Sequence, residues 1–371
     1  RNSVDTAKIF CVNGDYLADI SAVGILDAMM GETYDYDIYP VINAQNLVIA
    51  DLPAFVSENE EEMQKRYSQS AQAVYQEIVW PSLTSIASRT GAKMTCMMTP
   101  QFTYTDEEEP DGENVTYYLK RLKEEHAEAG LSADSREGIL LSEKIKQDQT
   151  FWQTYAPSYR FLSLYADGVK SIGEESALPA EIRTVALGSG ASGQAVGYLN
   201  ENVTLQPSTS SGIRHTFLDD FKVKCMETAL GYSNITPDLY SVTYPEGDDD
   251  SWEKMSKKIA ANLGTYWKAY EAFDATTLTE SDVRIRRFLA LDYKQQRAGN
   301  VITLSLEHRE DAAWFLLRLH GEKVTEVAGG SFEEIEDGVY LILAEEDEVS
   351  VEVQNGETWQ YQDGGKCGDG T

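Results

Sequence analysis

The sequence has few of the residues that bind transition metals or cross-link a chain. Only four of its 371 residues are histidine and only four are cysteine. The cysteines, Cys11, Cys96, Cys225 and Cys367, form neither a CxxC pair nor another metal-binding spacing. We therefore expect no framework of disulfides, which does not exclude secretion. Cys11 and Cys96 lie in apolar runs, where cysteine commonly serves as a small core residue.

Long hydrophobic runs are also missing. No run approaches the roughly 18 apolar residues of a membrane-spanning helix, so we expect no membrane span in this chain. The chain begins at Arg1, without an initiator methionine or a signal peptide, and we expect it to be a mature fragment. The composition is otherwise globular, with 42% hydrophobic and 25% charged residues, and the length predicts two domains.

Basic residues are scarce relative to acidic ones. The chain has 31 basic and 62 acidic residues, which give a net charge of −31. Such a surface repels phosphate groups and anionic lipid, so we expect no nucleic-acid partner. A neutral or cationic partner is compatible with this charge, and the charge also serves solubility by itself.

The stretch 38–54, IYPVINAQNLVIADLPA, organises the rest of the chain. Its apolar run 47–50 predicts a strand buried on both faces, and Asp51 and Pro53 end that strand. A carboxylate just past the C-terminal end of such a strand lies where α/β barrels and open α/β sheets place their chemistry. An ordinary turn-forming aspartate is the alternative interpretation.

Helical and strand-like segments alternate along most of the chain. The periodicity of apolar residues predicts helices over 20–30, 60–90, 115–129, 135–155, 215–230 and 251–270. Short apolar runs predict strands over 8–13, 92–100, 183–188, 203–207 and 239–245. This repeated order indicates an α/β architecture with a parallel sheet or barrel.

The pattern changes near residue 298, where short strands broken by Gly, Asp and Asn begin. We predict a small antiparallel β-sandwich over 298–360 and a flexible tail over 361–371. The barrel is predicted over 38–297. Residues 1–37 are predicted to be a strand–helix remnant of a preceding domain that packs on the barrel.

Several segments together resemble a known family. They are VNGDYLADISAVGILDAMM, YPVINAQNLVIADLPA, YQEIVWPSL, the helix with Trp252 and the closing β-domain. From about 8 to 353 the chain resembles an uncharacterised bacterial family whose members accompany Pel-like exopolysaccharide gene clusters. The central domain of that family is similar to NodB-type polysaccharide deacetylases.

This resemblance implies a (β/α)7-type barrel with its site at the C-terminal ends of the strands. It also implies extracytoplasmic placement, at the cell surface or secreted. In the deacetylases, one Asp and two His hold a metal that polarises the acetamide, and a second Asp acts as general base.

The sequence departs from that pattern at the residues that matter for catalysis. Ala50 stands in the position of the base, and Asp51 alone retains the metal-type carboxylate. Ser132 and Arg136 occupy the positions of the two histidines, and neither replaces an imidazole ligand. The late segment 241–245 also lacks a histidine. We therefore expect neither a metal nor another cofactor.

Of the four histidines, only one is predicted to lie at the barrel mouth. His215 follows Arg214 after a predicted strand, whereas His126, His308 and His320 lie in a charged helix or in the β-domain. A helix-start residue without a ligand role is the alternative for His215. Two metal-binding histidines cannot be assembled from this set.

The first functional hypothesis is a degenerate deacetylase-like domain that binds without catalysis. Its partner would be a polysaccharide, cationic or containing N-acetylhexosamine, or a protein of the exopolysaccharide machinery. Asp51 and His215 are the catalytic candidates in case activity survives. The ligand-binding candidates are Asp51, Tyr104, Ser132, Asp134, Arg136, Tyr159, Arg160, Arg214 and Tyr244.

The second hypothesis is an active hydrolase with relocated catalytic groups. It would be a metal-dependent polysaccharide deacetylase, with a divalent metal such as zinc, or another glycan hydrolase. The available carboxylates are Asp51, Asp134, Asp219, Asp220, Asp248 and Asp249. A glycosidase needs two of them about 5–9.5 Å apart, and the sequence shows no such pair.

Overall fold

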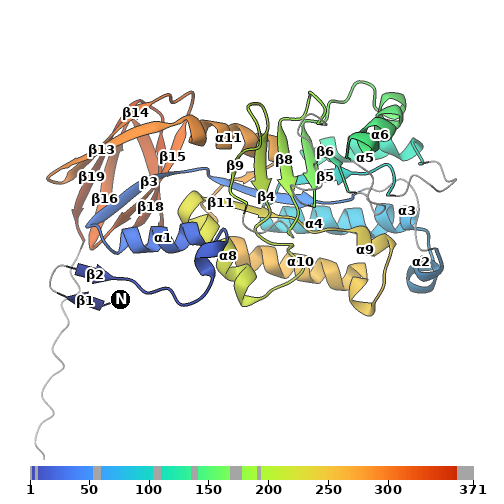
Figure 1. Ribbon diagram of the computed structural model, residues 1–371, viewed down its shortest axis with the longest axis horizontal. Coiled ribbons are helices and arrows are strands. Elements are labelled where there is room, and N and C mark those ends of the chain that lie inside the picture. Colours follow the sequence, from blue (N-terminus) through green and yellow to red (C-terminus); the bar gives the residue numbers. More distant parts are fainter. Residues whose placement is uncertain are drawn as a thin grey trace, which may run out of the picture. The chain divides into compact units, whose positions relative to one another are not determined.

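The computed structural model describes residues 2–4, 7–52, 60–102, 110–134, 141–167, 178–189 and 194–356 (Figure 1). The chain divides into two compact units. The first contains Arg1–Met29 and Val41–Ala290, and the second contains Met30–Pro40 and Leu291–Thr371. Across the described ranges, no helix combines the length and the apolar character that a membrane crossing requires.

A mostly parallel sheet forms the centre of the first unit. Its strands are β4 (Ala44–Ile49), β5 (Met94–Met98), β6 (Glu128–Ser132), β7 (Ser163–Ala166), β8 (Thr184–Leu187), β9 (Gly197–Tyr198), β10 (Thr204–Pro207), β11 (Tyr232–Ile235) and β12 (Ala275–Thr276). Their order is β11-β4-β5-β6-β7-β8-β10-β9, with β12 also paired to β4. Among the strands that the structure describes in this sheet, β9 alone runs antiparallel to its neighbour. Strands β4, β5, β7 and β8 are buried along their whole length, as strands covered on both faces are.

Helices separate most of these strands along the chain. They are α1 (Ala22–Gly31), α2 (Glu60–Tyr67), α3 (Ala71–Val74), α4 (Trp80–Thr90), α5 (Glu113–Glu124), α6 (Leu141–Tyr155), α8 (Phe217–Leu230), α9 (Tyr240–Thr243), α10 (Trp252–Trp267) and α11 (Leu278–Ala290). The helix predicted over 60–90 is divided by a π-helix, Tyr75–Val79, and Pro81 lies in the first turn of α4. Gly91 ends α4 in the left-handed conformation.

The sheet is curled, and polar side chains meet inside the curve. Asn46 on β4 and Gln206 on β10 belong to strands that are far apart in the sheet order, yet Asn46 Nδ2 donates to Gln206 Oε1 at 3.1 Å. Beyond β10 the chain reaches β11, because Thr209 N donates to Asn234 O at 2.8 Å. The prediction of a mixed α/β fold is confirmed, with the sheet curled into a half-barrel.

The second unit contains two antiparallel sheets, as the sequence predicted for the C-terminal region. Their strands are β3 (Tyr36–Val41), β13 (Asp292–Ala298), β14 (Val301–Glu307), β15 (Ala313–Leu319), β16 (Glu322–Ala328), β17 (Gly330–Glu336), β18 (Val339–Ala344) and β19 (Glu348–Asn355). The sheet orders are β13-β14-β19-β16 and β17-β18-β15-β3. Ile38, Ile302 and Phe315 are buried together in one core.

The unit boundaries differ from those predicted. β3 joins the β-sheet unit, whereas the sequence analysis placed 1–37 in a remnant domain and began the barrel at 38. Pro40 suits this position, because β3 lies at the end of its sheet order and proline is tolerated in edge strands. The first strand of the C-terminal block begins at Asp292, before the predicted start of the sandwich.

One predicted strand is wrong, and one predicted helix ends earlier than expected. The segment 239–245 is not a strand, because 240–243 forms the short helix α9. The strand in this part of the chain is β11, which precedes the predicted segment. Its sequence YSNI is too polar to indicate a buried strand. Its polar groups find partners inside the fold: Trp267 Nε1 donates to Ser233 Oγ at 2.8 Å, and Asn234 Nδ2 donates to Gln206 O at 3.2 Å. The helix predicted over 115–129 ends at Glu124, and β6 begins at Glu128.

Glu227 on α8 is a buried acid behind the sheet. Its side chain is fully buried, and Gln45 Nε2 donates to its Oε1 at 3.1 Å. Its Oε2 is buried and has no hydrogen-bond partner among the described residues. Burial raises the pKa of Glu227 to about 8, against the lowering effect of hydrogen bonds from Ser233 and Gln45.

We expect Glu227→Gln to change how stability depends on pH. Because the folded state raises the pKa of Glu227 from 4.5 to about 8, the proton stabilises the fold fully below pH 4.5. That contribution is lost as the pH rises to about 8. The variant should therefore exceed wild type in free energy of unfolding above this range, by roughly 1–4 kcal/mol. Urea unfolding across pH measures the difference.

The matched control for this experiment is Glu326→Gln, the same change on an exposed part of β16. It should leave the pH dependence of the wild-type protein unaltered. Stability curves of Glu227→Gln and wild type that stay parallel across the whole pH range would contradict the expectation.

Candidate functional site

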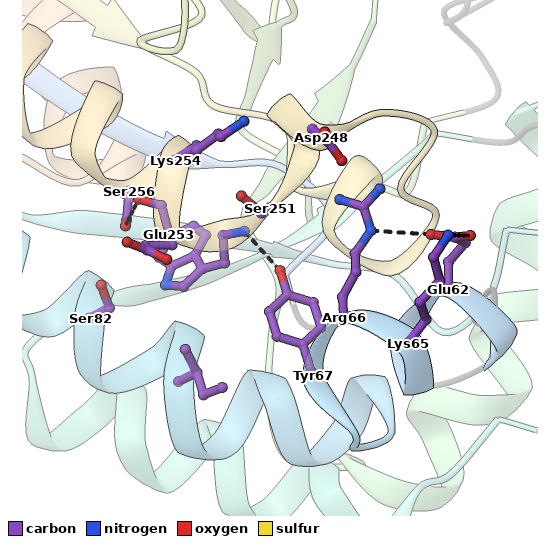
Figure 2. A pocket seen from close by; sticks show the side chains of 12 residues that line it. Glu62, Lys65, Arg66, Tyr67, Ser82, Asp248, Ser251, Glu253, Lys254 and Ser256 are labelled. Carbon is purple, nitrogen blue, oxygen red and sulfur yellow. Dashed lines mark hydrogen bonds and ion pairs between the residues drawn. The ribbon is translucent and has the colours of Figure 1, made fainter.

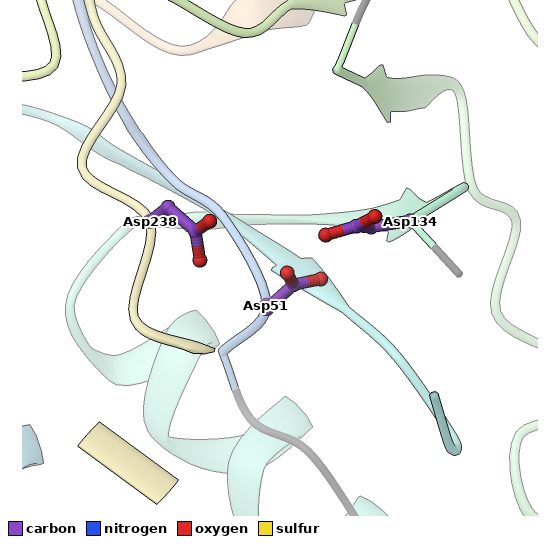
Figure 3. Close-up of side chains that lie close together, drawn as sticks. All are labelled: Asp51, Asp134 and Asp238. Atoms are coloured by element: carbon purple, nitrogen blue, oxygen red, sulfur yellow. The ribbon is translucent and has the colours of Figure 1, made fainter. Parts of the chain in front are cut away.

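Three aspartates meet at the carboxyl ends of three parallel strands of the same sheet. Asp51 follows β4, Asp134 follows β6 and Asp238 follows β11. One carboxylate oxygen from each residue lies within 4.8 Å of one from each of the others. Figure 3 shows the three side chains turned toward one another. We call these three residues the carboxylate cluster.

Asp51 is the buried member of the cluster. Its side chain has no exposed surface, and its φ of 55° places the backbone in the left-handed region. Aspartate visits this region more readily than most residues, but at a cost in energy. Ser132 Oγ donates to Asp51 Oδ1 at 2.6 Å. Asp51 Oδ2 is buried and has no hydrogen-bond partner in the described part of the chain.

Backbone contacts hold the other two aspartates in place. Asp134 N donates to Ser132 Oγ at 3.1 Å, so one serine contacts two members of the cluster. Ala50 N donates to Pro237 O at 2.9 Å, which brings the segment after β11 beside the end of β4. Tyr240 N donates to Asp238 Oδ1 at 2.8 Å. Asp134 and Asp238 are half-buried, so both are open to solvent in part.

The cluster favours retention of a proton on Asp51. Burial raises the pKa of Asp51 well above 3.8, and the negative charges of Asp238 and Asp134 raise it further. The hydrogen bond from Ser132 acts in the opposite direction and is the weaker influence. Perturbed carboxylates of this kind concentrate at functional sites, because a fold gains nothing in stability from them.

Tyr165 on β7 adds a neutral hydroxyl to this edge of the sheet. It is 4% exposed and packs with Val48 and Ala186 inside the curled sheet. A Cβ atom at Gly188, just past β8, would lie 2.7 Å from the Tyr165 hydroxyl, which places that hydroxyl at the carboxyl ends of the strands. Burial and the nearby carboxylates raise its pKa, so the hydroxyl keeps its proton.

Aromatic side chains lie next to the cluster. Tyr240 and Tyr244 are stacked with ring centroids 4.6 Å apart, and Phe102 meets Tyr240 edge-on at 4.9 Å. Phe102 follows β5, and both tyrosines follow Asp238 in the chain. Phe102 is buried, whereas the half-buried rings of Tyr240 and Tyr244 suit contact with apolar faces of a ligand.

The structure brings three predicted site residues together: Asp51, Ser132 and Asp134. Tyr244 belongs to the stacked pair of tyrosines just described. The strand predicted over 239–245 is absent, and Tyr244 instead directly follows the helix α9. Tyr104 and Arg136 lie outside the described residues.

The remaining predicted site residues lie elsewhere. His215 is exposed, stacks on Tyr266 and has its Nδ1 3.2 Å from Asn262 Oδ1, and Arg214 beside it is exposed as well. The hydroxyl of Tyr159 donates to Ala129 O at 3.4 Å. Tyr159 and Arg160 line a hollow of about 510 Å³ that extends to Ser132.

Asp238 and Tyr165 were missed from the sequence. Asp238 follows a strand that was not recognised, so its place past a strand end could not be seen. The available signal was the sequence ITPD, in which a turn with proline and aspartate closes the run YSNI. Tyr165 lies in APSYRFLSLYADG, where no local feature separates it from the other tyrosines.

A zinc site of the Asp-His-His type does not fit these residues. Among the described residues, the only potential metal-binding group of His, Cys, Asp or Glu is the carboxylate cluster, which contains no histidine. Zinc favours nitrogen and sulfur ligands, whereas an all-oxygen set suits hard cations such as Mg²⁺, Ca²⁺ or Mn²⁺.

A separate hollow of about 770 Å³ lies beside α2 and α10, away from the cluster residues. Figure 2 shows its polar lining, in which Arg66 Nε pairs with Glu62 at 3.3 Å. Trp252 N donates to Tyr67 Oη at 2.8 Å and so joins the start of α10 to the end of α2. The charged side chains that line this hollow are of both signs and largely compensate one another.

Comparisons with known proteins give limited similarity. A family model described as "Uncharacterised protein conserved in bacteria (DUF2194)" matches residues 1–137. No curated protein matches the chain. The structure of a proposed polysaccharide deacetylase from Mycobacterium smegmatis has 10% identity and a TM-score of 0.40, over 66% of this chain and 90% of its own. That of a proposed glycoside hydrolase/deacetylase from Parabacteroides distasonis has 9% identity and a TM-score of 0.40, over 75% and 82%.

The family match covers the segment that contains β4 and Asp51, and it agrees with the predicted resemblance to an uncharacterised bacterial family. With TM-scores this low, neither structural likeness carries an argument about activity or substrate.

We expect Asp51→Asn to remove the free-energy cost of burying the Asp51 carboxylate beside two other carboxylates. Because the folded state raises the pKa of Asp51 above 3.8, the proton stabilises the fold fully below pH 3.8 and less as the pH rises through the folded pKa. Asparagine keeps the shape and can still accept from Ser132. The variant should have a higher free energy of unfolding than wild type at neutral pH, measured by urea unfolding, and this gain should shrink as the pH falls.

Asp167→Asn is the control, since Asp167 is exposed at the end of β7. Its effect should stay within about 0.5 kcal/mol. If Asp51→Asn lowered stability equally at acidic and neutral pH, the carboxylate would be a favourable structural group and this electrostatic account would be wrong.

Proposed function

We propose that this chain hydrolyses a carbohydrate substrate at the carboxylate cluster, with catalytic groups relocated relative to the deacetylases that its sequence resembles. The observation that carries the proposal is the convergence of Asp51, Asp134 and Asp238 at the carboxyl ends of three strands. Neighbouring like charges and a buried carboxylate cost stability, so their presence at this edge favours a functional explanation. That the substrate is a carbohydrate is an expectation from the sequence resemblance.

Each cluster residue has a role that its surroundings support. Asp134 and Asp238 are half-buried, so water can reach them, and either can accept a proton from a water molecule that attacks the substrate. Asp51 is too deeply buried for that role, and its raised pKa favours the neutral acid, which removes one negative charge from between its neighbours. Tyr165 keeps its proton and can donate a hydrogen bond to a substrate oxygen.

Binding without turnover is the second candidate. Ala50 favours it, because this buried methyl group occupies the position where the resemblance places the general base. In that case the acidic cluster and the Tyr240–Tyr244 pair would bind a cationic or N-acetylhexosamine-containing polysaccharide. A (β/α)7 barrel, partners in exopolysaccharide machinery and extracytoplasmic placement are further proposals that depend on the resemblance.

The test uses the full chain with N-acetylglucosamine oligomers and with a partly deacetylated glucosamine polymer. Released acetate reports deacetylation, and new reducing ends report glycosidic cleavage. We expect one of these products from wild type. Asp238→Asn should lower kcat by about 10²-fold or more, because general acid–base catalysis contributes that much.

Asp249→Asn serves as the matched control, since its side chain is 79% exposed. It should leave the rate unchanged. Saturable binding of an oligomer with no product, weakened in Asp238→Asn, would replace hydrolysis by binding. Neither product nor binding with any of these glycans would reject both candidates.

A further inference from the structure

We propose that the carboxylate cluster is a site for a hard divalent cation of the Ca²⁺, Mg²⁺ or Mn²⁺ class. Three carboxylates from different strand ends each offer an oxygen to a common space. In Figure 3, Asp51 lies between Asp134 and Asp238, and the three carboxylates converge. An acidic cluster alone would not establish such a site, so the case depends on what else surrounds Asp51.

The second observation is the unpartnered oxygen of Asp51. Asp51 is fully buried, and Ser132 occupies its Oδ1, while Oδ2 has no hydrogen-bond partner in the described ranges. A buried oxygen without a partner loses its hydration and gains nothing in return. A cation bound to Oδ2 supplies the missing interaction.

The charges around Asp51 favour a cation as well. The main electrostatic influences on its carboxyl group are the negative charges of Asp238 and Asp134. A bound cation would turn the repulsion among the three carboxylates into attraction, because each carboxylate would then be a ligand of the positive ion. A single proton can neutralise only one of the three groups.

The donor atoms decide the class of ion. All three ligands are carboxylates, with no imidazole or thiolate among them. Hard cations take oxygen ligands at about 2.0–2.6 Å and fill their remaining positions with water. Two oxygens on one such ion lie at most about 4–5 Å apart, which is compatible with the spacing within 4.8 Å seen here. The histidine-based zinc site that the sequence resemblance implies is thus replaced by a site of different selectivity.

A carboxylate must be deprotonated to bind a cation, so metal ions and protons compete for the oxygens of the cluster. Ser132 keeps Asp51 Oδ1 engaged and so directs Oδ2 toward the ion.

The test is titration of the chelator-treated full chain with CaCl2, MgCl2, MnCl2 and ZnCl2, followed by calorimetry and thermal unfolding. We expect at least one of the three hard cations to bind with a stoichiometry of one. At about 100 times its Kd, that cation should raise Tm by roughly 4–8 °C. Asp51→Asn should abolish the heat and the shift, and Asp249→Asn, at an exposed site, should retain both.

Absence of binding by all three hard cations would overturn the inference, as would equal binding by Asp51→Asn or binding of zinc alone. Since Asp51→Asn is expected to fold at least as well as wild type, loss of binding in that variant is interpretable. A Ser132→Ala variant adds a graded control and should bind the same cation more weakly.

The binding measurement needs no substrate, and only its consequence for turnover rests on the proposed function. A cation that binds without any glycan turnover leaves this inference standing and rejects hydrolysis. Turnover that survives chelation unchanged, with no binding, leaves hydrolysis standing and rejects the cation site.

Discussion

The structure of the first unit depends on hydrogen bonds between polar side chains across the concave face of its sheet. Asn46 bonds to Gln206, and Thr276 Oγ1 donates to Asn46 Oδ1 at 2.7 Å. Gln206 Nε2 also reaches Thr184 Oγ1 at 2.8 Å. Groups that are buried in this way must find partners, and only a curled sheet brings β4, β8 and β10 close enough to provide them. The curvature in turn directs the carboxyl ends of β4, β6 and β11 toward a common space.

The position of α11 complements this network at the start of the strands. Leu278 N donates to Thr95 Oγ1 at 3.0 Å, and the hydroxyl of Thr279 bonds to Glu128 at 2.7 Å. Thr95 and Glu128 lie near the beginnings of β5 and β6. The amino ends of these strands are therefore occupied by structure, whereas the carboxyl ends carry the acidic groups. This division between a stabilising end and a reactive end is general in α/β barrels.

Two buried acids illustrate opposite relations between stability and function. Glu227 lies behind the sheet, with amide and hydroxyl donors near it, and holds a proton as a structural group. Asp51 is equally buried, but its neighbours are two further carboxylates and its backbone is left-handed. The strain and the repulsion at Asp51 are the features that distinguish a site from a core.

The sequence by itself determined the class of the fold and pointed to Asp51, Ser132 and Asp134 as candidate site residues. Alternating apolar runs and helical periods indicated α/β structure, short strands indicated the C-terminal β-sheets, and the end of the run 47–50 indicated Asp51, since these signals are local. Tertiary structure alone decided that β3 leaves the first unit, that the polar run YSNI forms β11, and that Asp238 joins Asp51 and Asp134. Those outcomes depend on strand order and on partners far away in the chain, because a polar side chain is acceptable in a buried strand only when distant residues satisfy its hydrogen bonds.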